Sequence, residues 1–86
     1  MNHLHTESVS PLPGYRLAVR FSNGAAGEIN LVDELWGEMF TPLLNESLFM
    51  TAKRDPIMRT VIWDNGADFA PEFLLDLLQK QSSKAA

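Results

Sequence analysis

The sequence predicts a small α+β domain with a mainly antiparallel sheet of about five strands and helices on one face, in the order β-β-β-α-α-β-β-α. Two observations indicate this class. Residues 15–31 alternate between apolar and polar side chains around an Asn-Gly turn. Residues 60–71 join a β-branched run to a second Asn-Gly turn and to a proline that opens a helix. Strands and helices that occur in separate runs are typical of α+β folds.

Composition limits the size and the class of the domain. The chain has 86 residues, 45% of them hydrophobic, and no cysteine, so one core must form without disulfides. We expect a single domain over residues 1–80 and a disordered tail over residues 81–86. The chain has a net charge of −4, so it lacks the excess of basic residues that is typical of proteins that bind a DNA duplex. Without a signal-peptide pattern or an apolar run long enough for a bilayer, a cytoplasmic location is expected.

The first three strands follow from alternation and turn residues. Ser8–Leu12 is a short strand, and Pro11 confines it to an edge or a strand end. Tyr15–Phe21 alternates cleanly, and the turn at residues 22–24 leads into Ala25–Leu31. This pair of strands is predicted to be a β-hairpin.

The length of the hairpin loop decides which residues face each other. A two-residue loop would set Val19 opposite Glu28 and mix the two faces of the sheet. A three-residue loop, with Gly24 in the left-handed region, sets Leu17 opposite Ile29 and keeps the apolar face intact. We therefore predict the three-residue loop.

Two short helices are expected after the hairpin. Asn30 is a suitable N-cap for a helix at Leu31–Trp36, and Asn45 is a suitable N-cap for a helix at Glu46–Lys53. The connection around Pro42 is predicted to be irregular.

Ile57–Trp63 is predicted to be the central strand, because both of its faces are largely apolar and would need helix cover. A turn at residues 64–66 leads to a brief strand at Ala67–Phe69. Pro71 is well placed as the first residue of the last helix.

The polar residues around position 65 are interpreted as structural. Asp64, Asn65 and Asp68 lack the spacing of a calcium loop. We expect Asn65 and Gly66 to supply positive φ angles, and Asp68 to accept hydrogen bonds from amides at the start of the last helix. Trp63 is expected to be a core residue whose indole N–H has one partner.

With these elements placed, the chain resembles the domain-of-unknown-function 2442 family of small bacterial proteins from about Val9 to Leu78. The residues that carry the resemblance are Pro11 to Tyr15, Phe21, Asn23, Gly24, Phe40, Leu43, Leu48, Phe49, Val61, Trp63, Asn65 to Asp68 and Pro71. The resemblance implies a fold and no established activity. Some relatives look like such a domain followed by a helix-turn-helix. Members are also often encoded beside another small protein, an arrangement similar to toxin–antitoxin pairs.

Trp36, Met39 and Phe40 are the predicted partner-binding residues. Trp36 stands beside Gly37 near a helix end, where its side chain would be partly exposed. The three side chains would then form an apolar patch for a partner protein or a second copy.

No catalytic, metal or cofactor site is predicted. His3 and His5 lie on one side of an extended segment outside the expected core, and two ligands do not make a metal site. Nucleophilic catalysis would need a hydroxyl or thiol held beside a base. We therefore do not predict an enzyme.

We accordingly predict a small non-enzymatic protein-interaction module, in its concrete form the antitoxin-like partner of a neighbouring small protein. An acidic surface favours a basic partner, and a homo-oligomer is the alternative. Neither nucleic acid nor a membrane is expected as a partner.

Two other functions stay open. A nucleic-acid-linked component of a transcriptional regulator would use the cations Arg16, Arg20, Lys53, Arg54 and Arg59, although the first two are expected to pair with Glu28. A small-ligand-binding protein or enzyme would need a deep pocket lined by Asp64, Asp68 and Glu72.

Overall fold

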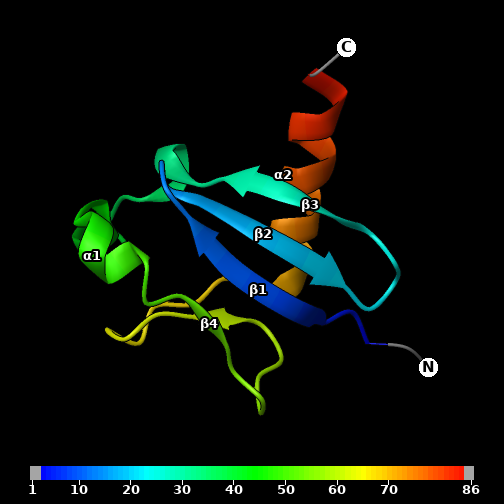
Figure 1. The fold of residues 1–86 in the computed structure, drawn as a ribbon, viewed down its shortest axis with the longest axis horizontal. Coiled ribbons are helices and arrows are strands. Elements are labelled where there is room, and N and C mark those ends of the chain that lie inside the picture. The colour runs from blue at the N-terminus through cyan, green and yellow to red at the C-terminus, as the bar shows by residue number, and fades with distance from the viewer. Residues whose placement is uncertain (1–2, 85–86) are drawn as a thin grey trace.

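Three antiparallel strands form the larger sheet, in the order β1-β2-β3, and the last helix crosses behind them (Figure 1). The computed structural model describes residues 3–84. Its elements are β1 Thr6–Leu12, β2 Arg16–Phe21, β3 Ala26–Asn30, the 3-10 helices η1 Val32–Glu34 and η2 Thr41–Leu44, α1 Glu46–Phe49, β4 Lys53–Arg54, β5 Val61–Ile62 and α2 Pro71–Lys84. β4 and β5 form a second antiparallel sheet. The predicted α+β class is confirmed, with the strands divided between two sheets.

The predicted register of the first hairpin is confirmed. Leu17 lies opposite Ile29, and the Phe21 amide donates to the Ala25 carbonyl at 2.8 Å, so the loop has three residues. Gly24 has a φ of 92°, in the left-handed region that favours glycine. The buried face of β2 and β3 therefore stays apolar.

The two Asn-Gly turns are built in the same way. In each, an aromatic residue, a polar residue, Asn, Gly and Ala follow one another, at residues 21–25 and 63–67. The Asn side chain accepts a hydrogen bond from the Ala amide, at 3.0 Å in the first turn and 3.1 Å in the second. Gly66 has a φ of 89°, but Asn65 has no positive φ, so only the glycine supplies the left-handed residue. The prediction that Asn65 would do so as well is wrong.

Helix α2 packs closely on the larger sheet through a glycine. A Cβ atom added at Gly27 would lie 2.8 Å from Cδ1 of Leu78. The absence of a side chain at Gly27 therefore sets how near the helix approaches β3. The buried core consists of Leu17, Val19, Phe21, Ile29, Leu31, Leu35, Leu43, Phe49, Ala52, Val61, Trp63, Ala67, Leu74, Leu77 and Leu78.

The C-terminal part of α2 is tied to the outer edge of β3. The Gln81 carboxamide accepts from the Asn30 amide at 2.8 Å and donates to the Asn30 carbonyl at 2.8 Å. This pair of bonds imitates a neighbouring strand at the sheet edge. Residues 81–84, which we expected to lie in the tail, are part of α2, and residues 85–86 lie outside the described residues.

The predicted central strand at 57–63 is wrong for most of its length, because only the two residues of β5 pair with another strand. The chain forms a tight loop instead. The Asp55 carboxylate accepts from the Ile57 and Met58 amides at 3.1 and 2.7 Å, and the Arg59 amide donates to the Asp55 carbonyl at 2.8 Å. These local bonds satisfy amides that a strand would offer to its neighbour.

The brief strand predicted at Ala67–Phe69 is reduced to a single bridge between Ile62 and Asp68. The first two predicted helices are also shorter than expected. η1 covers three residues of the first, and α1 covers four residues of the second. Short helices extend only as far as their tertiary contacts support them. The Asn45 side chain accepts from the Ser47 amide at 3.0 Å, as its predicted capping role requires.

Thr6 joins the two sheets. It is fully buried, its amide donates to the Arg59 carbonyl at 2.9 Å, and its hydroxyl donates to the same carbonyl at 3.2 Å. The Thr6 carbonyl accepts from Nε of Arg54 at 2.6 Å. The loop after β4 is therefore anchored to β1 at both of its ends.

Candidate functional site: an apolar groove beside two glutamates

An apolar groove of about 360 Å³ opens between the loop that follows η1 and the start of α2. Its lining residues are Glu34, Trp36, Gly37, Glu38, Met39, Phe40, Phe69 and Phe73. We call this surface the aromatic groove. It brings the three predicted partner-binding residues into one cavity and adds two phenylalanines that sequence reasoning did not assign to a site.

Stacked aromatic rings form the wall of the groove. Phe40 stacks on Phe69 with ring centroids 4.4 Å apart, and Phe69 stacks on Phe73 at 5.1 Å. Behind them, Trp63 meets Phe69 edge to face at 5.8 Å. The ring of Phe69 therefore connects the groove to the core, and its position is set by packing on three sides.

Trp36 and Met39 form the exposed part of the groove, with 72% and 46% of their surfaces accessible. Large apolar side chains exposed together on one cavity are typical of contact surfaces. Asn65 holds this segment in place, because its Nδ2 donates to the Met39 carbonyl at 3.0 Å. Asn65, which was predicted to serve the turn, thus also positions a residue of the predicted contact patch.

The two glutamates give the groove an acidic border. Glu38 is exposed and Glu34 is half-buried, and the residues that line the groove include no Lys, Arg or His. Charged side chains at the border of an apolar surface select partners of opposite charge.

Trp63, Pro71 and Asp68 were also predicted to serve the fold. Trp63 is 1% exposed, and its indole N–H donates to the Phe49 carbonyl at 2.9 Å, as a core residue with one partner should. Pro71 is the first residue of α2. Among the described residues, the Asp68 carboxylate makes no hydrogen bond to the helix amides, so its predicted capping role is not observed. The Thr60 hydroxyl secures this segment instead, through a 2.6 Å bond to the Phe69 carbonyl.

The three carboxylates considered for ligand chemistry do not line the aromatic groove. Asp64 lies 3.7 Å from the Lys53 ammonium on the surface. Glu72 is exposed and Asp68 is half-buried. Within residues 3–84, no three acidic or histidine side chains are close enough together to hold a metal ion.

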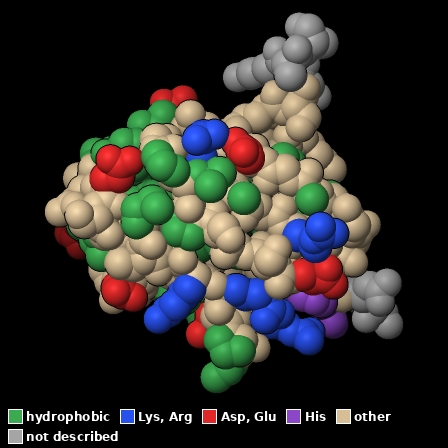
Figure 2. Space-filling view, viewed as in Figure 1, with side chains coloured by type: hydrophobic (Ala, Val, Ile, Leu, Met, Phe, Trp, Pro, Cys, Tyr) green, Lys and Arg blue, Asp and Glu red, His purple; other side chains and the backbone are tan. Residues whose placement is uncertain are grey.

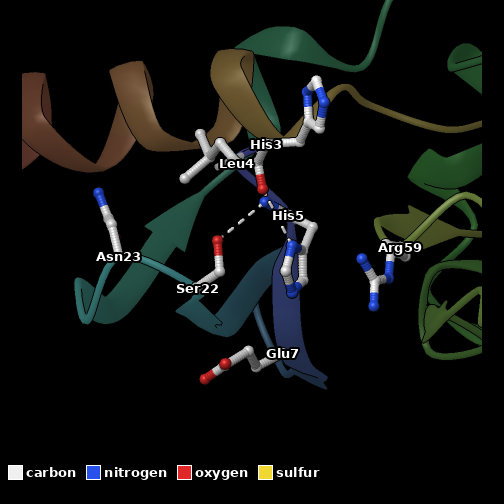
Figure 3. Close-up of a pocket in the computed structure, with 7 residues that line it drawn as sticks. All are labelled: His3, Leu4, His5, Glu7, Ser22, Asn23 and Arg59. Atoms are coloured by element: carbon white, nitrogen blue, oxygen red, sulfur yellow. Dashed lines mark hydrogen bonds between the residues drawn. The ribbon is translucent and has the colours of Figure 1, made fainter. Parts of the chain in front are cut away.

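A second cavity, of about 540 Å³, lies near the start of β1 (Figure 3). It is lined by His3, Leu4, His5, Glu7, Ser22, Asn23 and Arg59. The His5 amide donates to Oγ of Ser22 at 3.1 Å, which ties this segment to the end of β2. Both imidazoles line this cavity, and in Figure 3 their rings point away from each other rather than toward a common point.

The charged residues on the outer sheet face are partly paired. Arg16 contacts Glu28 at 2.6 Å, as expected from the register, and its Nε donates to the Pro13 carbonyl at 3.0 Å. No ion pair joins Arg20 to Glu28 in the part of the chain that the structure describes.

None of the helices within residues 3–84 is long and apolar enough to cross a membrane.

A family model described as a protein of unknown function, DUF2442, matches residues 6–79. The chain belongs to the DUF2442 family. This confirms the resemblance drawn from the Trp63–Pro71 region and the first hairpin. No protein with a curated description matches this DUF2442 domain.

The fold of the DUF2442 domain is similar to that of a candidate DNA-binding protein from Nitrosomonas europaea, known from a crystal structure, with a TM-score of 0.81 and 23% sequence identity. The similarity covers 96% of this chain and 56% of that protein. The chain therefore spans little more than half the length of its structural relative. At this level of identity the likeness concerns the fold alone.

Proposed function

We propose that this DUF2442 domain is a protein-interaction module and that the aromatic groove is its contact surface. The observation that carries the proposal is the exposure of Trp36 in a groove that three stacked phenylalanines also line. Tryptophan is enriched among the residues that contribute most binding energy in protein interfaces. The ring wall is packed against the core, so little side-chain freedom is lost when a partner binds.

The chemistry of the groove indicates what the partner presents. A bulky aliphatic or aromatic side chain would fill the apolar cavity, and Lys or Arg beside it would face Glu34 and Glu38. A basic protein encoded beside this chain, as in an antitoxin-like pair, would have this chemistry. The net charge of −4 would speed its association.

Co-expression with the adjacent gene tests the proposal. We expect the neighbouring protein to co-purify with the chain, and the substitution Trp36→Ser to weaken the complex about 30-fold, as loss of a central tryptophan does. Affinity is measured by isothermal titration calorimetry with the two purified proteins.

Met50→Ser is the matched control, because Met50 is 42% exposed and does not line the groove. We expect this variant to bind like the original chain. Equal binding by the Trp36→Ser variant, or no complex at micromolar concentration, would contradict the proposal.

A second candidate function rests on the basic side chains. Figure 2 shows Lys and Arg gathered along the lower edge of the visible face, near β4 and the loop that follows it. The N. europaea protein with the same fold is described as a candidate DNA-binding protein. A nucleic-acid-linked regulator would use this edge, with Arg54 and Arg59 facing the phosphates.

Salt dependence tests this second function. If the basic edge binds a DNA duplex, affinity should fall steeply as salt rises, and Arg59→Ala should lower the slope of log K against log salt by about 1. Fluorescence anisotropy of a labelled duplex measures both. The absence of binding at low salt would remove this candidate.

A further inference from the structure

The loop at residues 55–59 exposes apolar side chains that the fold does not use. Ile57 is 88% exposed and Met58 is 50% exposed. Both extend from the turn between β4 and β5, and Figure 2 shows hydrophobic side chains projecting at that edge, beyond the basic ones. We call residues 55–59 the finger.

Hydrogen bonds hold the finger in one conformation. Besides the bonds that its carboxylate accepts, Asp55 donates its own amide to the Thr60 carbonyl at 2.9 Å, which closes the base of the loop. The Arg59 carbonyl accepts from both the amide and the hydroxyl of Thr6. A loop already ordered in its binding conformation loses little entropy when it docks.

Basic side chains lie at the base of the finger, between its apolar tip and the rest of the fold (Figure 2). Lys53 and Arg54 precede the finger in β4, where Lys53 lies 3.7 Å from Asp64 and Arg54 donates to the Thr6 carbonyl, and Arg59 belongs to the finger itself. The one acidic residue of the finger, Asp55, uses its carboxylate to accept hydrogen bonds from two amides of the loop. The finger therefore presents an aliphatic tip with basic flanks.

This description matches the partner chemistry that the aromatic groove requires. The groove is apolar, its charged lining residues are Glu34 and Glu38, and no cation lines it. Both halves of a complementary contact are thus present on one chain, in different segments.

We propose that the finger of one copy docks in the aromatic groove of a second copy, with Ile57 in the cavity and Arg59 facing the glutamates. This inference rests on the proposed function, since it takes the groove to be a contact surface and names its occupant. The contact joins two different surfaces, so it closes into a dimer only if it occurs twice, and otherwise extends into a ring or a chain of copies.

A contact through one finger is smaller than the roughly 800 Å² per partner of a stable interface, so association is weak. Sedimentation velocity between about 10 μM and about 1 mM covers the expected range. We expect the average mass to rise with concentration, and to rise less at high salt because the charged flanks are screened. A chain that stays monomeric over this range would overturn the inference.

Mixing two variants tests the pairing directly. Ile57→Asp removes the finger tip and keeps the groove, whereas Trp36→Ser damages the groove and keeps the finger. Each variant alone should be monomeric, and an equal mixture should form a heterodimer through its one intact finger and one intact groove. A mixture that stays monomeric, while the original chain associates, would overturn the finger–groove pairing.

One control variant and one further measurement separate this inference from the proposed function. Met50→Asp changes an exposed apolar residue outside both surfaces and should associate like the original chain. The sedimentation measurements use the purified chain alone, whereas calorimetry with the neighbouring protein tests the proposed function. If Ile57→Asp abolishes self-association and the calorimetric affinity for that protein is unchanged, both proposals stand. If Ile57→Asp still self-associates, the finger does not occupy the groove and this inference fails. The proposed function of the groove is then tested by its affinity for the neighbouring protein alone.

Discussion

Replacement of Trp63 by alanine is expected to lower the free energy of unfolding by about 3–5 kcal/mol, the usual cost of removing a large aromatic side chain from a core. Trp63 is 1% exposed, contacts the rings of Phe49 and Phe69, and donates a buried hydrogen bond to the Phe49 carbonyl. Truncation leaves a cavity and removes one of the two hydrogen bonds to the Phe49 carbonyl, which also accepts from the Ala52 amide at 3.2 Å. Urea denaturation followed by circular dichroism measures the loss.

The second tryptophan is the control for this substitution. Trp36 is 72% exposed, so Trp36→Ala should change stability by no more than about 0.5 kcal/mol. The contrast separates a tryptophan that serves the fold from one available for binding. A loss of less than about 1 kcal/mol for Trp63→Ala would contradict the core packing described above.

Replacement of Thr60 by valine is expected to cost about 1–3 kcal/mol, although the two side chains have nearly the same shape. The Thr60 hydroxyl donates to the Phe69 carbonyl at 2.6 Å, and valine would leave that carbonyl without this donor. The residue itself is 3% exposed, so water does not readily replace the bond. Thermal unfolding monitored by calorimetry gives the difference.

Thr60→Ser keeps the hydroxyl and loses one methyl group, so it should be less destabilising than Thr60→Val if the hydrogen bond dominates. The reverse order would show that packing of the methyl group matters more. Because Phe69 is the middle ring of the groove wall, Thr60→Val should also weaken partner binding while Trp36 remains intact.

The first hairpin was predictable in detail because its signals are local. The alternation from Tyr15 to Phe21 determines which side chains share a face of the sheet, and the Asn23-Gly24 pair determines the length of the loop. The register of the hairpin therefore follows from residues that are close in sequence. The last helix began where Pro71 indicated for the same reason. Short-range turn chemistry is therefore a reliable guide in this chain.

The finger was not predictable from the same kind of pattern. Its apolar letters fit a buried strand, but the Asp55 carboxylate competes for the amides of Ile57 and Met58, and a local Asp-Pro turn prevails. An Asp followed directly by Pro was a signal that the loop continued beyond position 56.

The predicted contact patch was found only in part. Trp36, Met39 and Phe40 are close in sequence, and their position near a glycine indicated exposure. Phe69, just before α2, and Phe73, in its first turn, join them only through tertiary packing. The sequence shows that both residues are aromatic, but it does not show that they lie across the groove from residues 36–40.

The most direct test of the central claim is a ¹⁵N-labelled NMR spectrum of the chain recorded as the co-purifying protein is added. If the aromatic groove is the contact surface and the polar residues near Asn65 serve the turn, the largest shifts should fall on residues 36–40, 69 and 73, including the Trp36 indole signal. Shifts centred on Asp64, Asp68 and Glu72, with the Trp36 indole signal unmoved, would contradict it.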